Sequence, residues 1–252
     1  MGKRASWLAS VLFVATATTG FAHASEILIG TGEFPPYATE KTDDQGCALN
    51  IIRHAYEAER WAVHFRFLPW PRNLVSLSRG EIDASAYWAK RPDRQEELIF
   101  AKNPVAAEIY KFVFPKDAIV EWDTYEDLRG KTIIINSSYT YNEEFYEALD
   151  EFEIEIIAVA AEDQNLGMLL KGRADLTIMN EKVFRKYVSE LSADEQLRLH
   201  IGSKPALTVH GFLVFSKADS ETSRRLADVF DSGYAKIRRD EELREAFKTC
   251  GF

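Results

Sequence analysis

The hydrophobic positions of the chain alternate between the spacing of strands and the spacing of helices. Compact or alternating apolar runs predict strands, and apolar residues three or four positions apart predict the helices between them. In the first half of the chain, strands are predicted at 27–29, 63–67 and 82–86, with helices at 49–56 and 71–77. This alternation of strands and helices favours a parallel sheet covered by helices.

The same order returns in the second half of the chain. Strands are predicted at 132–135, 154–159 and 174–179, with helices around 145–149 and 166–170. The turn Gly80-Glu-Ile-Asp83 in the first half corresponds to Gly172-Arg-Ala-Asp175 in the second. We therefore expect an α/β protein of two similar lobes, each a mostly parallel sheet flanked by helices.

Two similar extended segments, 110–115 and 211–217, bracket the second half. If both cross between the lobes, the chain leaves the first lobe once and returns once, and the amphipathic helices of the tail complete that lobe. The predicted division is 25–111 with 212–252 for lobe 1, and 112–211 for lobe 2. Ligands of open α/β sheets bind beyond the carboxyl ends of the strands, so both lobes are expected to face one cleft.

The first 24 residues contain no acidic residue and have the pattern of an export signal. Lys3 and Arg4 precede an uncharged apolar run from residue 7 to 21, and the small residues around Ala24 predict cleavage after that position. The alternative is an uncleaved membrane anchor, for which the run is short. No cysteine follows the run, so lipid attachment is not indicated. We expect a soluble, periplasmic protein.

Composition and charge narrow the class of partner. The 252 residues are 46% hydrophobic and 28% charged, with a formal net charge of −9. Without Lys3 and Arg4 the chain would hold 29 basic against 40 acidic residues, a net charge of −11. Such an acidic chain argues against nucleic acid or an anionic membrane as partner. Its two cysteines, Cys47 and Cys250, would form a disulfide in an oxidising compartment or remain as two buried thiols.

The usual signatures of catalysis and metal binding are missing from the sequence. Gly30-Thr-Gly32 lacks the third glycine of a dinucleotide-binding turn, and there is no phosphate-binding P-loop or Gly-x-Ser-x-Gly elbow. None of the four histidines after the signal has the spacing of a metal-binding pair. We expect no cofactor and no metal.

Candidate ligand-binding residues lie where predicted strands end. They are Glu33, Phe34, Tyr37, Trp70, Tyr87, Trp88, Arg91, Arg94, Ser138, Tyr139, Thr140 and Asn180. An arginine fork is suited to hold a carboxylate with two hydrogen bonds. Each group also has a plain structural interpretation: a proline-rich turn, a solvated run of charges, or hydroxyl residues that cap a helix.

Taken in order, these segments resemble the periplasmic solute-binding proteins of amino-acid ABC importers, the type II bilobal group. The matching features are Ile27-Leu-Ile-Gly-Thr31 with Pro35-Pro-Tyr37, Gly80-x-x-Asp83 followed by Arg94 and Phe100, Asp127-Leu-Arg-Gly-Lys131, Gly172-x-x-Asp175, and the returning strand 211–217. The resemblance covers nearly the whole chain after the signal. It implies two α/β lobes, joined by two crossover strands, that close on a ligand.

The resemblance also implies roles for single residues. Arg94 matches the arginine that holds the ligand α-carboxylate, and Tyr37 or Phe34 matches the aromatic wall. Tyr139 and Thr140 match a lobe-2 loop that contacts the carboxylate, although Ser138-Tyr139 replaces the usual Gly-Thr there. Asn180 stands where an aspartate usually receives the ligand ammonium.

One further departure bears on the ligand: Arg91 adds a second cation in place of a usual threonine. Glu33 could supply the negative charge that Asn180 lacks. With these departures, the resemblance implies that the ligand is an amino acid, a dicarboxylate or another small anion.

The sequence thus predicts a monomeric binding protein that delivers a small polar solute to the membrane permease of an ABC importer. One alternative is an enzyme that resembles cyclohexadienyl dehydratases, with Glu33 or Glu181 as general acid or base. Another is a free-standing sensor that hands its closed form to a membrane receptor.

Overall fold

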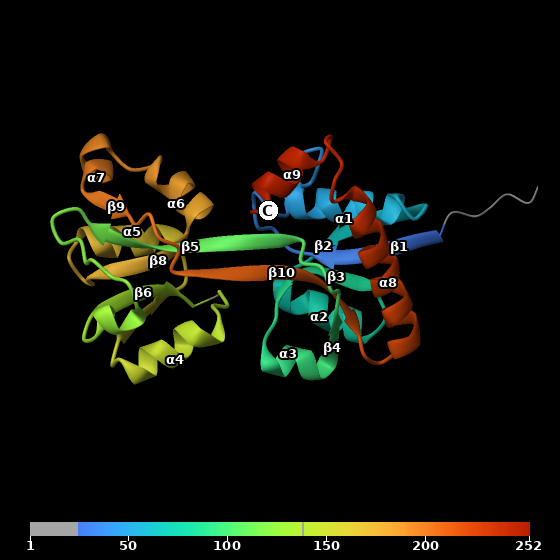
Figure 1. The fold of residues 1–252 in the computed structure, drawn as a ribbon, viewed down its shortest axis with the longest axis horizontal. Coiled ribbons are helices and arrows are strands. Elements are labelled where there is room, and N and C mark those ends of the chain that lie inside the picture. Colours follow the sequence, from blue (N-terminus) through green and yellow to red (C-terminus); the bar gives the residue numbers. More distant parts are fainter. Residues whose placement is uncertain (1–24, 138) are drawn as a thin grey trace, which may run out of the picture.

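A computed structural model describes residues 25–137 and 139–252 of the chain. Lobe 1 contains β1 (Ser25–Thr31), α1 (Cys47–Glu57), β2 (Trp61–Phe67), α2 (Trp70–Ser78), β3 (Ala84–Ala89), α3 (Pro92–Glu97), β4 (Leu98–Phe100), α8 (Ser220–Ile237) and α9 (Arg244–Thr249). Lobe 2 contains η1 (Tyr125–Leu128), β6 (Thr132–Asn136), α4 (Glu143–Glu151), β7 (Glu155–Val159), α5 (Glu162–Leu170), β8 (Leu176–Asn180), α6 (Glu181–Val188), α7 (Ala193–Leu197) and β9 (Leu199–Ile201). Two longer strands, β5 (Ala106–Pro115) and β10 (Leu207–Ser216), run between the lobes (Figure 1).

The strands are ordered β2-β1-β3-β10-β5-β8-β6-β7, with β4 paired to β10 and β9 paired to β5. In lobe 1, β1 is parallel to β2 and β3; in lobe 2, β6 is parallel to β7 and β8. The crossing strands β5 and β10 are antiparallel to each other and to their neighbours β8 and β3. The predicted fold class, two mostly parallel α/β lobes with two crossover strands, is confirmed.

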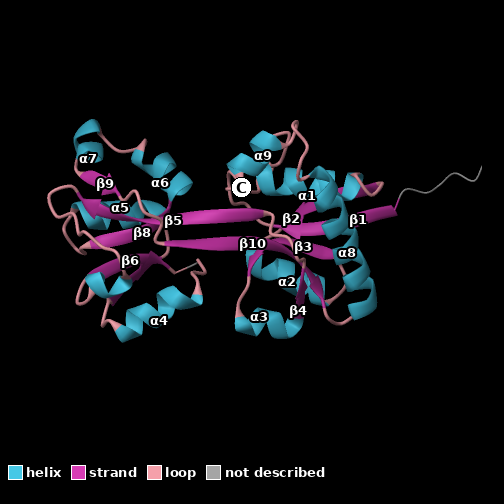
Figure 2. Ribbon diagram, in the orientation of Figure 1, coloured by secondary structure: helices cyan, strands magenta, loops and turns pink. Residues whose placement is uncertain are grey.

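Each lobe has a hydrophobic core of its own. In lobe 1, α1, α8 and α9 cover one face of the sheet and α2 the other, and in lobe 2 the helices α5 and α6 lie opposite α4 (Figure 2). The crossing strands contribute to both cores: Ala106 of β5 packs in lobe 1, whereas Phe112 packs in lobe 2. The predicted lobe boundaries, after residues 111 and 211, fall inside β5 and β10 and remain predictions.

The repeated Gly-x-x-Asp turn has the same role in both lobes. The Asp83 carboxylate accepts a hydrogen bond from the Leu28 N–H at 2.8 Å, and the Asp175 carboxylate accepts one from the Thr132 N–H at 2.9 Å. Each aspartate therefore ties a central strand, β1 or β6, to the turn that precedes the neighbouring strand, β3 or β8. For this reason β3 begins at Ala84, later than the predicted start at Ile82.

The start of α4 also differs from the sequence prediction. The hydroxyl residues after β6 were expected to cap a helix, but α4 begins at Glu143. Its N-cap is Asn142, whose side chain accepts a hydrogen bond from the Phe145 N–H at 3.0 Å. Residues 139–141 thereby lie between β6 and the helix, and Tyr139 contacts Phe34 of lobe 1.

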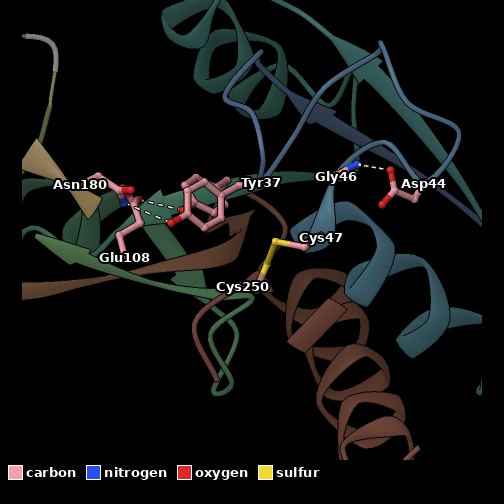
Figure 3. Close-up of a disulfide and its surroundings, with 8 residues drawn as sticks. Tyr37, Asp44, Gly46, Cys47, Glu108, Asn180 and Cys250 are labelled. Atoms are coloured by element: carbon pink, nitrogen blue, oxygen red, sulfur yellow. Dashed lines mark hydrogen bonds between the residues drawn. A yellow bond between two sulfur atoms is a disulfide. The ribbon is translucent and has the colours of Figure 1, made fainter. Parts of the chain in front are cut away.

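The C-terminal tail is fixed to lobe 1 and to a crossing strand. A disulfide joins Cys47, the first residue of α1, to Cys250 after α9 (Figure 3). The Cys250 carbonyl oxygen accepts a hydrogen bond from the Ala107 N–H of β5 at 2.7 Å. The tail thus contacts β5 one residue before Glu108, which is central to the site described below.

The predicted signal, residues 1–24, and the candidate residue Ser138 lie outside the described residues. Among the residues that are described, no helix is both long and apolar enough to cross a membrane.

Candidate functional site

A row of aromatic rings lies where the two lobes meet. Phe34 and Tyr37 come from the loop after β1, Tyr87 from β3, and Tyr139 from the loop after β6. The ring centroids of Phe34 and Tyr37 are 5.5 Å apart, those of Tyr37 and Tyr87 5.2 Å, and those of Phe34 and Tyr139 5.8 Å. Phe34 lies in lobe 1 and Tyr139 in lobe 2, so the row contains rings from both lobes.

The backbone turns Tyr87 into this row. Tyr87 has a φ of 72°, in the left-handed region that costs a tyrosine energy. Its ring lies against Gly211 of β10, where an added Cβ would approach the ring to 3.0 Å. The glycine gives the ring its space, and the Tyr87 hydroxyl can then reach β5.

The hydroxyl of Tyr87 donates to a buried carboxylate on the crossing strand. Glu108 of β5 is 5% exposed and accepts hydrogen bonds from Tyr87 at 2.8 Å and from Tyr110 at 2.9 Å. The Asn180 side-chain amide donates to the same carboxylate at 3.4 Å, and to the Tyr37 hydroxyl oxygen at 3.1 Å (Figure 3). The network therefore joins residues of both lobes through one side chain of β5.

Burial dominates the electrostatics of this network. Desolvation raises the pKa of Glu108 to about 7, although the hydrogen bonds from Tyr87, Tyr110 and Asn180 act in the opposite direction. Burial and the nearby Glu108 charge also raise the pKa of Tyr37 and of Tyr87, so both phenols keep their protons. Glu108 is thus the group of the network that titrates near neutral pH.

Asn180 has every side-chain group engaged. Its Oδ1 caps α6 by accepting hydrogen bonds from the Lys182 N–H at 2.9 Å and the Val183 N–H at 3.3 Å. Its amide group donates to Tyr37 and Glu108. At the position where the resemblance places a carboxylate, the structure therefore presents an amide donor toward lobe 1.

Arg94 belongs to a second group of side chains in lobe 1. Its guanidinium carbon lies 4.9 Å from the Trp88 ring, and Nη1 donates to the Ala89 carbonyl at 3.1 Å. Trp88 packs edge-on against Trp70 at 5.5 Å and donates its indole N–H to Ser85. Burial, followed by the charge of Arg91, lowers the pKa of Arg94.

Lys182 of lobe 2 faces the aromatic row. It is half-buried in the first turn of α6, and its Nζ lies 5.6 Å from the centre of the Tyr37 ring. Burial lowers its pKa. The adjacent Glu181 is engaged elsewhere, because its carboxylate pairs with Lys111 at 2.9 Å and with Arg185 at 2.7 Å.

The predicted site residues are therefore distributed over several places. The structure brings Phe34, Tyr37, Tyr87, Tyr139 and Asn180 together, and it groups Trp70 and Trp88 with Arg94. Arg91 lies at the surface with Asp93, their side chains 3.0 Å apart. Glu33 is exposed and accepts a hydrogen bond from the Glu40 N–H of its own loop. Thr140 is half-buried in the loop before α4.

Sequence reasoning missed Glu108, Tyr110 and Lys182. Glu108 is the single charged residue of the run from Val105 to Tyr110, which is otherwise uncharged and mostly apolar. A charge in such a run is expensive to bury without partners, so this position was a detectable signal. Lys182 carries no comparable signal, because a lysine in the first turn of a helix is ordinary. Among the described residues, no group of three or more His, Cys, Asp or Glu could hold a metal ion.

Comparison with known proteins shows the fold. No protein-family model and no curated protein matches the sequence. The probable amino-acid ABC transporter extracellular-binding protein of Bacillus subtilis matches with a TM-score of 0.71 at 21% identity, over 88% of this chain and 96% of that one. An ancestral arginine-binding protein bound to arginine matches with a TM-score of 0.65 at 16% identity, over 90% and 99%.

A third similar structure is a histidine kinase sensor domain with similarity to periplasmic binding proteins. It matches with a TM-score of 0.63 at 17% identity, over 88% of this chain and 93% of that one. The chain therefore has the type II periplasmic-binding-protein fold. It is the fold of the solute-binding proteins that serve amino-acid ABC importers, as the sequence predicts.

Proposed function

We propose that the protein captures a small solute bearing a carboxylate between its lobes and delivers it to the membrane permease of an ABC importer. The observation that carries the proposal is the set of side chains that meet across the lobes. Phe34 and Tyr37 of lobe 1 contact Tyr139 and Asn180 of lobe 2. Contacts that form only when the lobes approach can be used to couple ligand binding to closure.

The half-buried Arg94 is the group that would hold the ligand carboxylate. Its guanidinium rests on the Trp88 ring, and no ion pair to it is present among the described residues. Because the Arg94 guanidinium is partly removed from water, binding of a ligand carboxylate beside it is favourable. The planar guanidinium also fixes the orientation of that carboxylate.

A sensor is the second candidate function. It is favoured by the likeness to the histidine kinase sensor domain, which has the same two-lobed fold. In that case the closed form would be recognised by a membrane receptor instead of a permease. A gene for a permease beside the gene of this protein would favour the importer.

The dehydratase alternative is not favoured. The similar structures reported above are described as binding proteins or a sensor domain. The two carboxylates considered as acid or base are engaged or exposed: Glu181 pairs with Lys111 and Arg185, and Glu33 bonds to its own loop.

The proposal includes an exported monomer in the periplasm, cleaved after Ala24. The acid-free start supports export. The disulfide between Cys47 and Cys250 supports an oxidising compartment. Mass spectrometry of the exported protein tests the cleavage, since the mature chain would begin at Ser25.

The decisive experiment is a thermal-shift screen of the exported protein, freed of co-purified ligand by partial unfolding and dialysis. The panel holds the amino acids, a series of dicarboxylates, and prephenate. A ligand should raise the Tm by mass action, and small-angle scattering should show a smaller radius of gyration when it is bound. Arg94→Ala should abolish the shift. Arg224→Ala, which removes an exposed arginine of α8, should retain it.

Three outcomes contradict the proposal. They are the absence of any ligand on the panel, binding without closure, and turnover of prephenate. A shift that Arg94→Ala leaves unchanged would separate Arg94 from the ligand and refute its assigned role.

A further inference from the structure

The carboxylates near the lobe interface are already committed to groups of the protein. Both oxygens of Glu108 accept hydrogen bonds from Tyr87, Tyr110 and Asn180. Both oxygens of Glu181 pair with basic side chains. A ligand ammonium needs a charged acceptor that has no other partner. Neither Glu108 nor Glu181 can serve, because groups of the protein already bind their oxygens.

Asn180 strengthens this argument. An aspartate there could offer one oxygen to the helix and the other to a ligand. The asparagine has a single oxygen, which binds two N–H groups of α6, and it directs its NH₂ group toward Tyr37 and Glu108. An amide donor repels an ammonium group and attracts an oxygen.

Two half-buried cations, one in each lobe, are in the opposite situation. Within the described residues, Arg94 of lobe 1 and Lys182 of lobe 2 are half-buried and form no ion pair. Arg94 rests on Trp88, and Lys182 lies over Tyr37. Tyr87 and Trp88 are neighbours in β3 but pack in different clusters, so each cation rests on its own group of rings: Lys182 on the row of Tyr37 and Tyr87, and Arg94 on Trp88 with Trp70.

We propose that the ligand is an anion without an ammonium group, held by Arg94 from lobe 1 and by Lys182 from lobe 2. Its chemical class is a carboxylic acid with a second acidic or strongly polar oxygen group. The Tyr37 ring beneath Lys182 would contact the carbon chain at that end of the ligand. This inference rests on the proposed function. The ligand it proposes differs from the amino acid arginine, which is bound in one of the similar structures.

The test compares matched acids that differ by one ammonium group. Isothermal titration calorimetry is run with succinate against aspartate, glutarate against glutamate, and 3-phenylpropionate against phenylalanine. In at least one pair we expect the member without the ammonium to bind about tenfold tighter or more, since a buried ammonium without an acceptor is strongly disfavoured.

Two variants assign the second cation. Lys182→Gln should weaken the dicarboxylate by about tenfold and leave the phenylpropionate affinity nearly unchanged. Lys186→Gln removes the same charge one helical turn further along α6, where the side chain is exposed, and should bind like the wild type. If Lys182→Gln and Lys186→Gln bind the dicarboxylate equally well, Lys182 is not part of the site.

The outcomes separate this inference from the proposed function. Binding of the amino acid as tightly as its partner in every pair that binds overturns the inference, while closure on that amino acid upholds the proposed function. If the protein binds some other amino acid and none of the three acids without an ammonium group, the inference is also overturned and the proposed function is also upheld. If the wider panel also yields no ligand, both fail.

Discussion

The Tyr37 hydroxyl oxygen accepts a hydrogen bond of 3.1 Å from the Asn180 side-chain amide, 143 residues further along the chain. Tyr37 belongs to lobe 1 and Asn180 to lobe 2, so this bond is made across the interface. Asn180 also binds Glu108 on β5 and caps α6. A movement of lobe 2 therefore acts on Tyr37, on the crossing strand and on the first turn of α6 together.

Removing the Tyr37 hydroxyl should favour the open arrangement of the lobes. Tyr37→Phe keeps the ring contacts and deletes the acceptor, which costs about 1 kcal/mol for a buried hydrogen bond. We expect a ligand affinity about fivefold lower. Small-angle scattering of the ligand-free variant should give a larger radius of gyration than that of the wild type.

The control for this prediction is Tyr187→Phe, which removes a phenol hydroxyl from α6 of lobe 2 at a half-buried position. It should change neither the affinity nor the radius of gyration. Equal scattering curves for Tyr37→Phe and Tyr187→Phe would show that the Tyr37–Asn180 bond does not hold the lobes together.

Glu108 should make the stability of the protein depend on pH. Its pKa is about 7 in the folded protein and about 4.5 in the unfolded chain. Between these values the folded state binds one proton more, so the free energy of unfolding falls as the pH rises through this window, by up to about 3 kcal/mol. Below pH 4.5 this contribution is fully present, and above pH 7 it is lost.

Urea unfolding at pH 5 and pH 8 measures this effect. Glu108→Gln lacks the titrating group and should not lose this contribution as the pH rises. Its free energy of unfolding minus that of the wild type should therefore increase from pH 5 to pH 8. Glu57→Gln removes an exposed carboxyl of α1 and serves as the control. If the difference between wild type and Glu108→Gln were the same at both pH values, Glu108 would not take up a proton in this range.

The features that could be predicted from the sequence are those set by residues close together in the chain. The strand–helix order and the two Gly-x-x-Asp turns are local patterns, and both lobes follow them. The ends of elements were less accurate, because the β3 start depends on a bond between Asp83 and Leu28 in another strand. The Glu108 network was missed, since periodicity says nothing of contacts such as Glu108–Asn180, 72 residues apart.

Two glycines in helices should respond in opposite ways to the same substitution. Alanine favours a helix by about 1 kcal/mol over glycine where space allows. At Gly233 of α8 an added Cβ would lie 1.7 Å from the Ala55 carbonyl oxygen of α1, whereas at Gly167 of α5 it would meet nothing within 4 Å. Gly233→Ala should therefore lower the free energy of unfolding by about 1–3 kcal/mol. Gly167→Ala should raise it slightly, and a Tm that rises in both variants would contradict the close packing of α1 on α8.

Loss of the disulfide should destabilise lobe 1 and the crossing strand that the tail contacts. The bond closes a loop with a sequence separation of 203 residues, and its removal by the double variant Cys47→Ala, Cys250→Ala should cost about 2–5 kcal/mol. The tail would also be released from the Ala107 N–H beside Glu108, so the ligand affinity should fall together with the stability. Urea unfolding with and without reductant tests this: reductant should weaken the wild type and leave the double variant unchanged. Equal unfolding midpoints for the oxidised wild type and the double variant would mean that the bond adds nothing to stability, and an unchanged affinity would mean that the tail does not support the site.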